Sequence, residues 1–555
     1  MTIGPGASHP TVSEPVYAIG VDFGTESGRA LLLDLRSGQE LATSVVRYPS
    51  AVIDRTLPST GEPLPHDWAL QDPDDWVTVI EGTLPDVIER AGVPPDQVVG
   101  IGVDFTSCTV LPVTSQGVPL CTLERWREHR HAWPKLWKHH AAQPVADRLN
   151  QVAIDRGDDF LERYGGRISS EWYFPKLIEL WLEDREVYDE AAAFIEATDW
   201  IVWYLTGNEC RQSATAGYKA MWSEAEGLPS ADYFQAAYPG FDHPAEKLGT
   251  SFVPLGTRAG AVRSQVAERV GLSDSVAVAV GNVDAWVSVP GAGVEEPGTF
   301  VIVIGTSICD MVVHPEETRL PGITGVVKDG ILPGLYGYEA GQAAVGDMLA
   351  WFVDQLASDA GGYEALEQVA AKIGPGETGL VALDWWNGNR SILADADLGG
   401  AIVGLTLQST REQIYRALLE SIAFGSRRIM DNFEEYGLEL SQIVACGGIA
   451  ERSPLMMQLL ADTSGREVHV PDSREIPARG AALFGAVAAG VFDDIASAIS
   501  ATRPKSLRTY TPDLEAKPKF DRVYEIYRGL YDILGRSQVE LMHGLKRIRA
   551  DPSAS

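Results

Sequence analysis

Three aspartates each follow an apolar run of the sequence, in "GVDFGT" at Asp22, "GVDFTS" at Asp104 and "GNVDAW" at Asp284. Runs of this composition predict buried strands, and the ligands of open α/β sheets bind in the crevice where such strands end. Carboxylates gathered at one such edge could hold Mg²⁺ or accept a proton from a substrate. Taken singly, each aspartate is explained equally well as the cap of its own turn.

Two short turns place glycine beside hydroxyl side chains. The first is "GTES", residues 24–27, and the second is "GTS", residues 305–307, within "TFVIVIGTSICDMVV". Backbone N–H groups and hydroxyls that lie this close together are suited to binding phosphate oxygens. One such turn is usually an ordinary hairpin, but two at matching places could hold a polyphosphate between two halves of the chain. Asp22 aligns with Val303, so only the first half brings a carboxylate to its turn.

A third glycine-containing loop lies in "ACGGIAERSP", residues 445–454, between an apolar run and a helical pattern. The pair Gly447-Gly448 would let a flat ligand such as adenine approach the backbone closely. Such strand-to-helix loops are common, so the signal is weak when it stands alone. G-x-x-x-x-G-K-[ST] does not occur in the sequence, and the one G-x-G-x-x-G match, "GPGETG" at 374–379, precedes the apolar run "LVAL" instead of opening a helical pattern after a strand. A nucleotide site would therefore belong to neither the P-loop nor the Rossmann class.

The elements that must position these residues alternate between strands and helices, which indicates an α/β fold. The segment 411–433 has apolar residues near a 3.6-residue period, and Ser453-Pro454 offers a helix N-cap followed by a proline at the first position. The segments 98–107 and 443–455 also correspond, so the chain reads as two related halves. We place the boundary in "VPGAGVEEPGTF" and expect domains at residues 16–292 and 293–548, with flexible ends at 1–15 and 549–555.

Composition limits the class of partner. The 555 residues include 45% hydrophobic and 22% charged ones, and the formal net charge is −32. Nucleic acid and anionic membranes would repel such a chain, so a small-molecule partner is expected. The five cysteines form no C-x-x-C pair, residues 1–15 lack the features of a signal peptide, and no run of about 18 apolar residues occurs. These features predict a cytoplasmic protein without a zinc ribbon or a disulfide framework.

The motifs "DFGTES", "IGTS", "GNVDAW" and "ACGGIAERSP", in this order, together with "WYFPKLIELWLED" at 172–184, resemble the FGGY family of carbohydrate kinases. The resemblance covers nearly the whole chain. It implies two ribonuclease-H-like domains of the actin/hexokinase-like ATPase superfamily flanking a catalytic cleft. It also implies ATP and Mg²⁺, and phosphorylation of the terminal hydroxyl of a ketopentose by an enzyme that could form a homodimer.

The resemblance assigns roles to particular residues. Asp284 would be the catalytic base, and Asp22 would hold Mg²⁺ through water. The phosphates would be held by Gly24, Thr25, Glu26, Ser27, Gly305 and Thr306, the adenosine by Gly447 and Gly448, and the sugar by Ser107, Trp137, Lys219, Asp284 and Glu339. A lone lysine is usually solvated and a lone tryptophan is usually in the core, so Lys219 and Trp137 depend on the resemblance.

Other interpretations stay open at this point. A ribonuclease-H-like nuclease would also use carboxylates at strand ends, to hold two metal ions. An actin-like ATPase would share the phosphate turns, and a related kinase could act on D-ribulose, xylulose, ribitol or glycerol. The basic, aromatic stretch "REHRHAWPKLWKHH", residues 127–140, is interpreted as a structural helix at the edge of the sugar site, without a metal.

Overall fold

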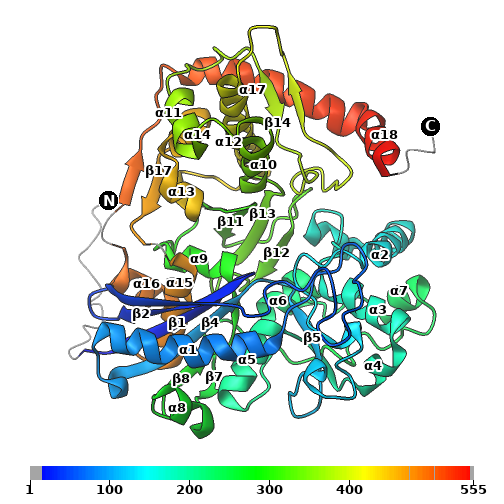
Figure 1. The fold of residues 1–555 in the computed structure, drawn as a ribbon, viewed down its shortest axis with the longest axis vertical. Helices are drawn as coiled ribbons and strands as arrows, with labels where there is room; N and C mark the ends of the chain where they lie inside the picture. The colour runs from blue at the N-terminus through cyan, green and yellow to red at the C-terminus, as the bar shows by residue number, and fades with distance from the viewer. Residues whose placement is uncertain (1–14, 474, 505–506, 551–555) are drawn as a thin grey trace.

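The computed structural model describes residues 15–473, 475–504 and 507–550, and it forms two lobes, each built around a seven-stranded sheet (Figure 1). In the first sheet the order is β3-β2-β1-β4-β8-β7, and β9 also pairs with β4. Its strands are β1 (Tyr17–Phe23), β2 (Ser27–Asp34), β3 (Glu40–Arg47), β4 (Val98–Phe105), β7 (Arg258–Ala261), β8 (Ala277–Ala279) and β9 (Asn282–Val283). β1 is antiparallel to β2 and parallel to β4.

The second sheet repeats this central arrangement. Its order is β12-β13-β11-β10-β16-β17-β18, with β10 antiparallel to β11 and parallel to β16. The strands are β10 (Thr299–Ile304), β11 (Ile308–His314), β12 (Gly325–Lys328), β13 (Tyr336–Gln342), β16 (Gln442–Cys446), β17 (Val468–Pro471) and β18 (Leu507–Tyr510). The two strand-turn-strand units and the α/β class predicted from the sequence are therefore confirmed.

Helices cover the sheets, and their ends follow local rules. The predicted helix at 411–433 is α12 (Arg411–Glu435), which opens with a capping box between Thr410 and Gln413. α14 (Pro454–Ser464) begins as predicted, because the Ser453 side chain accepts a hydrogen bond from the backbone N–H of Met456. Others are α1 (Pro73–Ala91), α5 (Ala197–Thr206), α8 (Ser264–Val270), α10 (Gly346–Leu356), α11 (Gly362–Ala370), α13 (Gly448–Arg452), α16 (Ile495–Thr502), α17 (Lys517–Asp532) and α18 (Val539–Ala550), beside the short pair β14 (Val381–Leu383) and β15 (Ala401–Val403).

A second, aromatic-rich core lies beside the first sheet. It is formed around α2 (Gln143–Arg156), α3 (Tyr173–Glu183), α4 (Arg185–Glu190), α7 (Ala231–Ala237), β5 (Val110–Val113) and β6 (Ala193–Glu196). The neighbouring helix α6 (Ser213–Lys219) contributes Ala214 and Tyr218 to a different core. The helix expected at 127–140 is wrong, because only the 3₁₀ turn Arg130–Ala132 forms there. Pro134 interrupts the segment because it has no N–H for a helix interior, and Lys135 is extended and bridges to Leu70 and Val110. The side chains of Lys135 and His139 contact the carboxylate of Glu179, and His131 contacts Lys135.

One helix from late in the chain belongs to the first lobe. α15 (Ile476–Ala488) packs on β1, β4 and α9 (Asp284–Gly291), as the orange helix among the blue strands of Figure 1 shows. Backbone touches backbone here, since a Cβ added to Gly102 would lie 1.8 Å from the carbonyl oxygen of Ala481. The hydrophobic core around α15 therefore combines residues from both halves of the sequence, among them Ala18, Val301 and Ala482.

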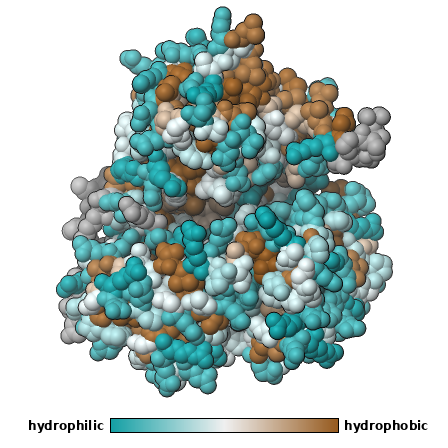
Figure 2. Space-filling model, viewed as in Figure 1, coloured by the Kyte–Doolittle hydropathy of each residue, from teal (hydrophilic) through white to brown (hydrophobic). Residues whose placement is uncertain are grey.

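The surface of the molecule is mostly polar on the face that Figure 2 shows. Polar residues cover most of the face shown in Figure 2, which is hollowed between the lobes, and apolar residues gather over the upper lobe near α17 and α18. Among the described residues no helix has the length and apolar character needed to cross a membrane. The expected flexible ends fall mainly on residues 1–14 and 551–555, which lie outside the described residues.

Candidate active site

The three predicted carboxylates lie together at one edge of the first sheet. The parallel pairing of β1 with β4 sets Asp22 beside Asp104, and the pairing of β4 with β9 sets Asp104 beside Asn282. Residues directly opposed on neighbouring strands point to the same face of the sheet, so these three form a row. Asp284 opens α9 two residues after Asn282. The sequence motifs identified the acids, and Asn282 is a member of the row that they missed.

Asp284 has the properties of a base that acts near neutral pH. Its Oδ1 accepts a hydrogen bond of 2.7 Å from the backbone N–H of Ala285, which leaves Oδ2 available. Burial, followed by the negative charge of Asp22, raises the pKa of Asp284 to about 7. A carboxylate with such a pKa can take a proton from a hydroxyl and release it again under physiological conditions.

The neighbouring acids are held in an environment with little positive charge. Arg29 Nε lies 3.6 Å from Asp22 Oδ2, and Arg29 Nη1 lies 3.5 Å from Glu475 Oε2, just before α15. Burial raises the pKa of Asp22, and burial together with Asp22 and Asp284 raises the pKa of Asp104 well above its usual range. Carboxylate oxygens are the ligands that Mg²⁺ prefers, so the donor set around Asp22 fits that ion.

The first glycine turn is fixed through its carbonyl groups. Tyr48 OH donates to the carbonyl of Gly24 at 2.9 Å, and Gln71 Nε2 donates to that of Thr25 at 2.8 Å. Trp137, predicted to contact the sugar, donates from Nε1 to Thr25 Oγ1 at 3.0 Å, so it is attached to this turn. The hydroxyl of Ser27 accepts from Arg29 Nη2 at 3.2 Å. These contacts fix the conformation of the turn.

The second turn and the Gly-Gly loop lie against each other. The N–H of Gly305 donates to the carbonyl of Ser307 at 2.9 Å, and the N–H of Val345 donates to that of Thr306 at 2.8 Å, just before α10. Gly447 has φ 91°, and a Cβ there would lie 2.6 Å from the carbonyl oxygen of Ile304. Only glycine fits this position easily. The predicted adenosine loop therefore adjoins the predicted phosphate turn of the second lobe.

Lys219 and Glu339 form a buried ion pair that joins the two halves of the chain. Lys219 Nζ, at the end of α6, lies 2.9 and 3.0 Å from the two carboxylate oxygens of Glu339 on β13. Trp286 Nε1, from the helix that Asp284 opens, donates to Glu339 Oε2 at 2.8 Å. Charged hydrogen bonds of this kind orient polar groups rigidly in a partly dry site. Trp286 lies in the "GNVDAW" motif, but the motif did not identify it as a site residue.

Ser107 occupies the turn after β4, and no hydrogen bond among the described residues connects its side chain to Lys219 or Glu339. The next residue, Cys108, has φ 60°, which is uncommon for a residue with a side chain. Lys176 fixes this strained turn, because its buried Nζ donates to the carbonyl of Cys108 at 2.7 Å and to that of Leu136 at 2.8 Å. The Lys of the "FPKL" motif therefore supports the turn.

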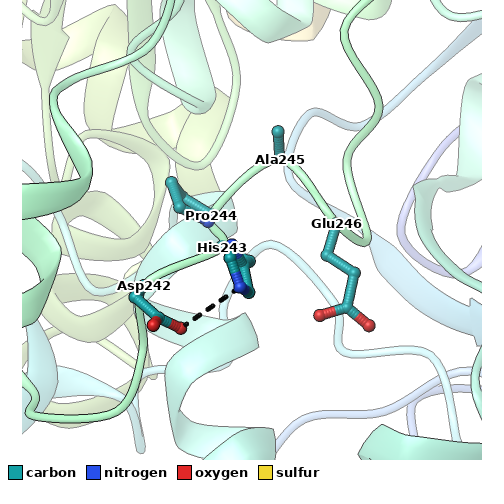
Figure 3. Close-up of a pocket in the computed structure, with 5 residues that line it drawn as sticks. All are labelled: Asp242, His243, Pro244, Ala245 and Glu246. Atoms are coloured by element: carbon teal, nitrogen blue, oxygen red, sulfur yellow. Dashed lines mark ion pairs between the residues drawn. The ribbon is translucent and has the colours of Figure 1, made fainter.

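A separate recess is bordered by the loop Asp242–Glu246 (Figure 3). It contains none of the predicted site residues, and His243 lies 3.8 Å from Asp242 with both side chains largely exposed. An exposed loop without buried polar groups offers little to orient a substrate. The chemistry is therefore expected at the three carboxylates Asp22, Asp104 and Asp284.

Comparison with known proteins identifies the family of the chain. The N-terminal domain model of the FGGY family of carbohydrate kinases matches residues 17–291, and the C-terminal domain model matches residues 300–489. A ribulokinase of Anoxybacillus flavithermus is 48% identical over 96% of each chain, and one of Mycolicibacterium smegmatis is 41% identical over 97% of each. The solved structure of xylulose kinase from Rhodospirillum rubrum has a TM-score of 0.75 and 25% identity, covering 93% of this chain and 99% of its own. The chain belongs to the FGGY family of carbohydrate kinases.

Proposed function

We propose that the protein is an ATP-dependent L-ribulokinase, which transfers the γ-phosphoryl group of ATP to the C5 hydroxyl of L-ribulose. The products would be L-ribulose 5-phosphate and ADP, in L-arabinose catabolism. The observation that carries this proposal is the identity of 48% to a ribulokinase over 96% of both chains. Membership of the family removes the nuclease and the non-kinase actin-like ATPase, because both family models are those of carbohydrate kinases.

In this proposal Asp284 accepts the proton of the C5 hydroxyl as that oxygen attacks the γ-phosphorus. The pKa of about 7 suits the base, and positioning with electrostatic stabilisation supplies most of the rest in phosphoryl transfer. Lys219, Glu339 and Trp286 would orient the sugar hydroxyls, and Ser107 would border the same space. Trp137 would link the sugar to the phosphate turn, because its Nε1 contacts Thr25.

The nucleotide would lie between the lobes. Gly24, Thr25, Glu26 and Ser27 would face the phosphates from residues 16–292, while Gly305, Thr306, Gly447 and Gly448 would hold the phosphates and adenosine from residues 293–548. Mg²⁺ near Asp22 would neutralise charge that develops on the transferred phosphoryl group. Closure of the lobes would keep water from competing with the sugar. The proposal also places the enzyme in the cytoplasm. It further includes a homodimer, and light scattering would test that oligomeric state.

The experiment that tests this function measures ADP release with Mg-ATP and L-ribulose, D-ribulose, D-xylulose, ribitol or glycerol, beside a sample without sugar. Strong stimulation by L-ribulose, with ribulose 5-phosphate identified as product, is expected. Stimulation by another sugar alone would keep the kinase and change the substrate. Hydrolysis of ATP that is independent of every sugar would contradict the proposal.

A further inference from the structure

Asp104 lies at the centre of the row formed with Asp22 and Asn282, and the side chain that meets its carboxylate is another acid, Asp22. The exposed fraction of Asp104 is 0%, and among the described residues no N–H or hydroxyl group donates a hydrogen bond to either carboxylate oxygen. Asn282 Nδ2 is also buried without an acceptor there. Leaving a buried polar atom unpaired destabilises the folded protein, and the cost is larger for a charged group. A carboxylate in this position therefore indicates that something else completes the site.

The surrounding charge suggests what that partner is. Asp22, Asp104 and Asp284 lie around the same space, and the cation beside them, Arg29, is shared with Glu475. A divalent cation would offset this excess of negative charge. Mg²⁺ keeps several of its waters when it binds proteins, and each bound water is a strong hydrogen-bond donor. The two unpaired acceptors of Asp104 match those donors in type.

We propose that Asp104 is a second carboxylate of the Mg²⁺ site, placed beside Asp22 by the strand register and accepting hydrogen bonds from waters of the ion. Asp104 is then a positioning residue, since it acts on the ion through water. The inference rests on the Mg²⁺ requirement of the proposed function. The resemblance to FGGY kinases gave Asp104 no role. The assignment comes from the pairing of β1, β4 and β9 and from the burial of the carboxylate.

The test uses Mn²⁺ as a paramagnetic probe and the full chain. Free Mn²⁺ is followed by electron paramagnetic resonance during titration of the wild type, Asp104→Asn and Asp310→Asn, with and without ADP. Asp310 is the matched control, because it is also 0% exposed with both oxygens unpaired, on β11 of the other sheet. We expect Asp104→Asn to raise the Kd of Mn²⁺ at least tenfold and Asp310→Asn to leave it within about twofold.

The outcomes separate this inference from the proposed function. A folded Asp104→Asn protein that binds Mn²⁺ as tightly as the wild type would overturn the role of Asp104 and leave the kinase untouched. Failure of the wild type to bind Mn²⁺ even with ADP would count against both. If Asp104→Asn does not fold, anomalous scattering from wild-type crystals with Mn²⁺-ADP decides. A peak linked through water to Asp104 supports the inference, and a peak without such a link refutes it.

Discussion

Asp284 has one carboxylate oxygen, Oδ2, that does not take part in the backbone hydrogen bond accepted by Oδ1, and its pKa is raised to about 7. The first prediction tests whether these two properties make it the base. Replacing Asp284 with Asn keeps the shape of the side chain and the hydrogen bond from Ala285, but removes the basic oxygen. We expect kcat to fall by about 10²–10⁴-fold while binding of ATP and sugar is preserved. Calorimetric titrations give the two affinities. A folded variant with turnover close to the wild type would remove Asp284 from the role of base.

The pH profile follows from the same carboxylate. Asp284 accepts a proton only when it is ionised, and burial with the charge of Asp22 raises its pKa to about 7. We therefore expect kcat/KM to reach its maximum above about pH 7 and to decrease as the pH falls below that value. Profiles from about pH 5 to pH 8 show this limb. Asp22→Asn should move the limb to lower pH, because it removes a negative charge, and a profile that is flat below pH 7 would contradict the assignment.

Glu339 balances the charge of Lys219 inside the protein. Glu339→Gln leaves the ammonium group without its counter-ion, so we expect a loss of stability of about 3–5 kcal/mol and a rise of roughly tenfold in the KM for sugar. Glu420→Gln is the matched control, since Glu420 forms a buried pair with Arg416 at 2.7 Å within α12. The control should lose stability while the sugar KM stays the same. Equal sugar KM values for both variants would argue against a role of Glu339 in binding.

The residue types of the site could be predicted from the sequence, but their partners could not. The motifs identified Asp22, Asp284 and the glycine turns because each lies where an apolar run ends in a polar turn, a pattern that is local in the chain. The contact of Lys219 with Glu339 spans 120 positions, and no local pattern encodes it. The position of Asp104 beside Asp22 likewise depends on strand register, which appears only when β1 and β4 pair.

At the scale of elements, the packing of α15 on β4 depends on glycine. Gly102→Ala would place a methyl group 1.8 Å from the carbonyl oxygen of Ala481, and backbone atoms cannot move aside as a side chain can. We expect a loss of about 3 kcal/mol or more in the free energy of unfolding. Gly529→Ala in α17 is the control, because its Cβ would meet nothing within 4 Å. That change should stabilise the protein by up to about 1 kcal/mol.

Chemical denaturation of both variants measures these effects. A loss for Gly102→Ala below about 0.5 kcal/mol would show that α15 can move away from the sheet at little cost.

The sequence predicted α12 and the start of α14 well, because their caps and apolar periods are local. It did not reveal that α15 joins the first lobe, since that contact is made by small residues that lie more than 370 positions apart.

At the scale of the whole molecule, α15 makes the first lobe depend on the end of the chain. Residues 15–292 contain β1, β4 and Asp284, but the core around them also includes residues of α15 and α16. Without these helices, the sheet face that carries Ala18, Leu31 and Leu33 would be exposed to water. Exposed apolar patches of this kind cause aggregation. We therefore expect that the fragment 15–292 does not fold alone.

Thermal unfolding followed by near-ultraviolet circular dichroism tests this prediction. The fragment 15–292 should aggregate or show no cooperative transition, whereas the same fragment joined by a flexible linker to residues 475–504 should show one. The linked protein restores the contact of Gly102 with α15, so it differs from the first fragment in the feature under test. A cooperative transition of the unlinked fragment at the temperature seen for the whole chain would contradict the prediction. Cooperative unfolding only in the linked form would mean that α15 and α16 complete the core of the first lobe, so that movement of α15 would displace the strand ends that carry Asp22 and Asp104.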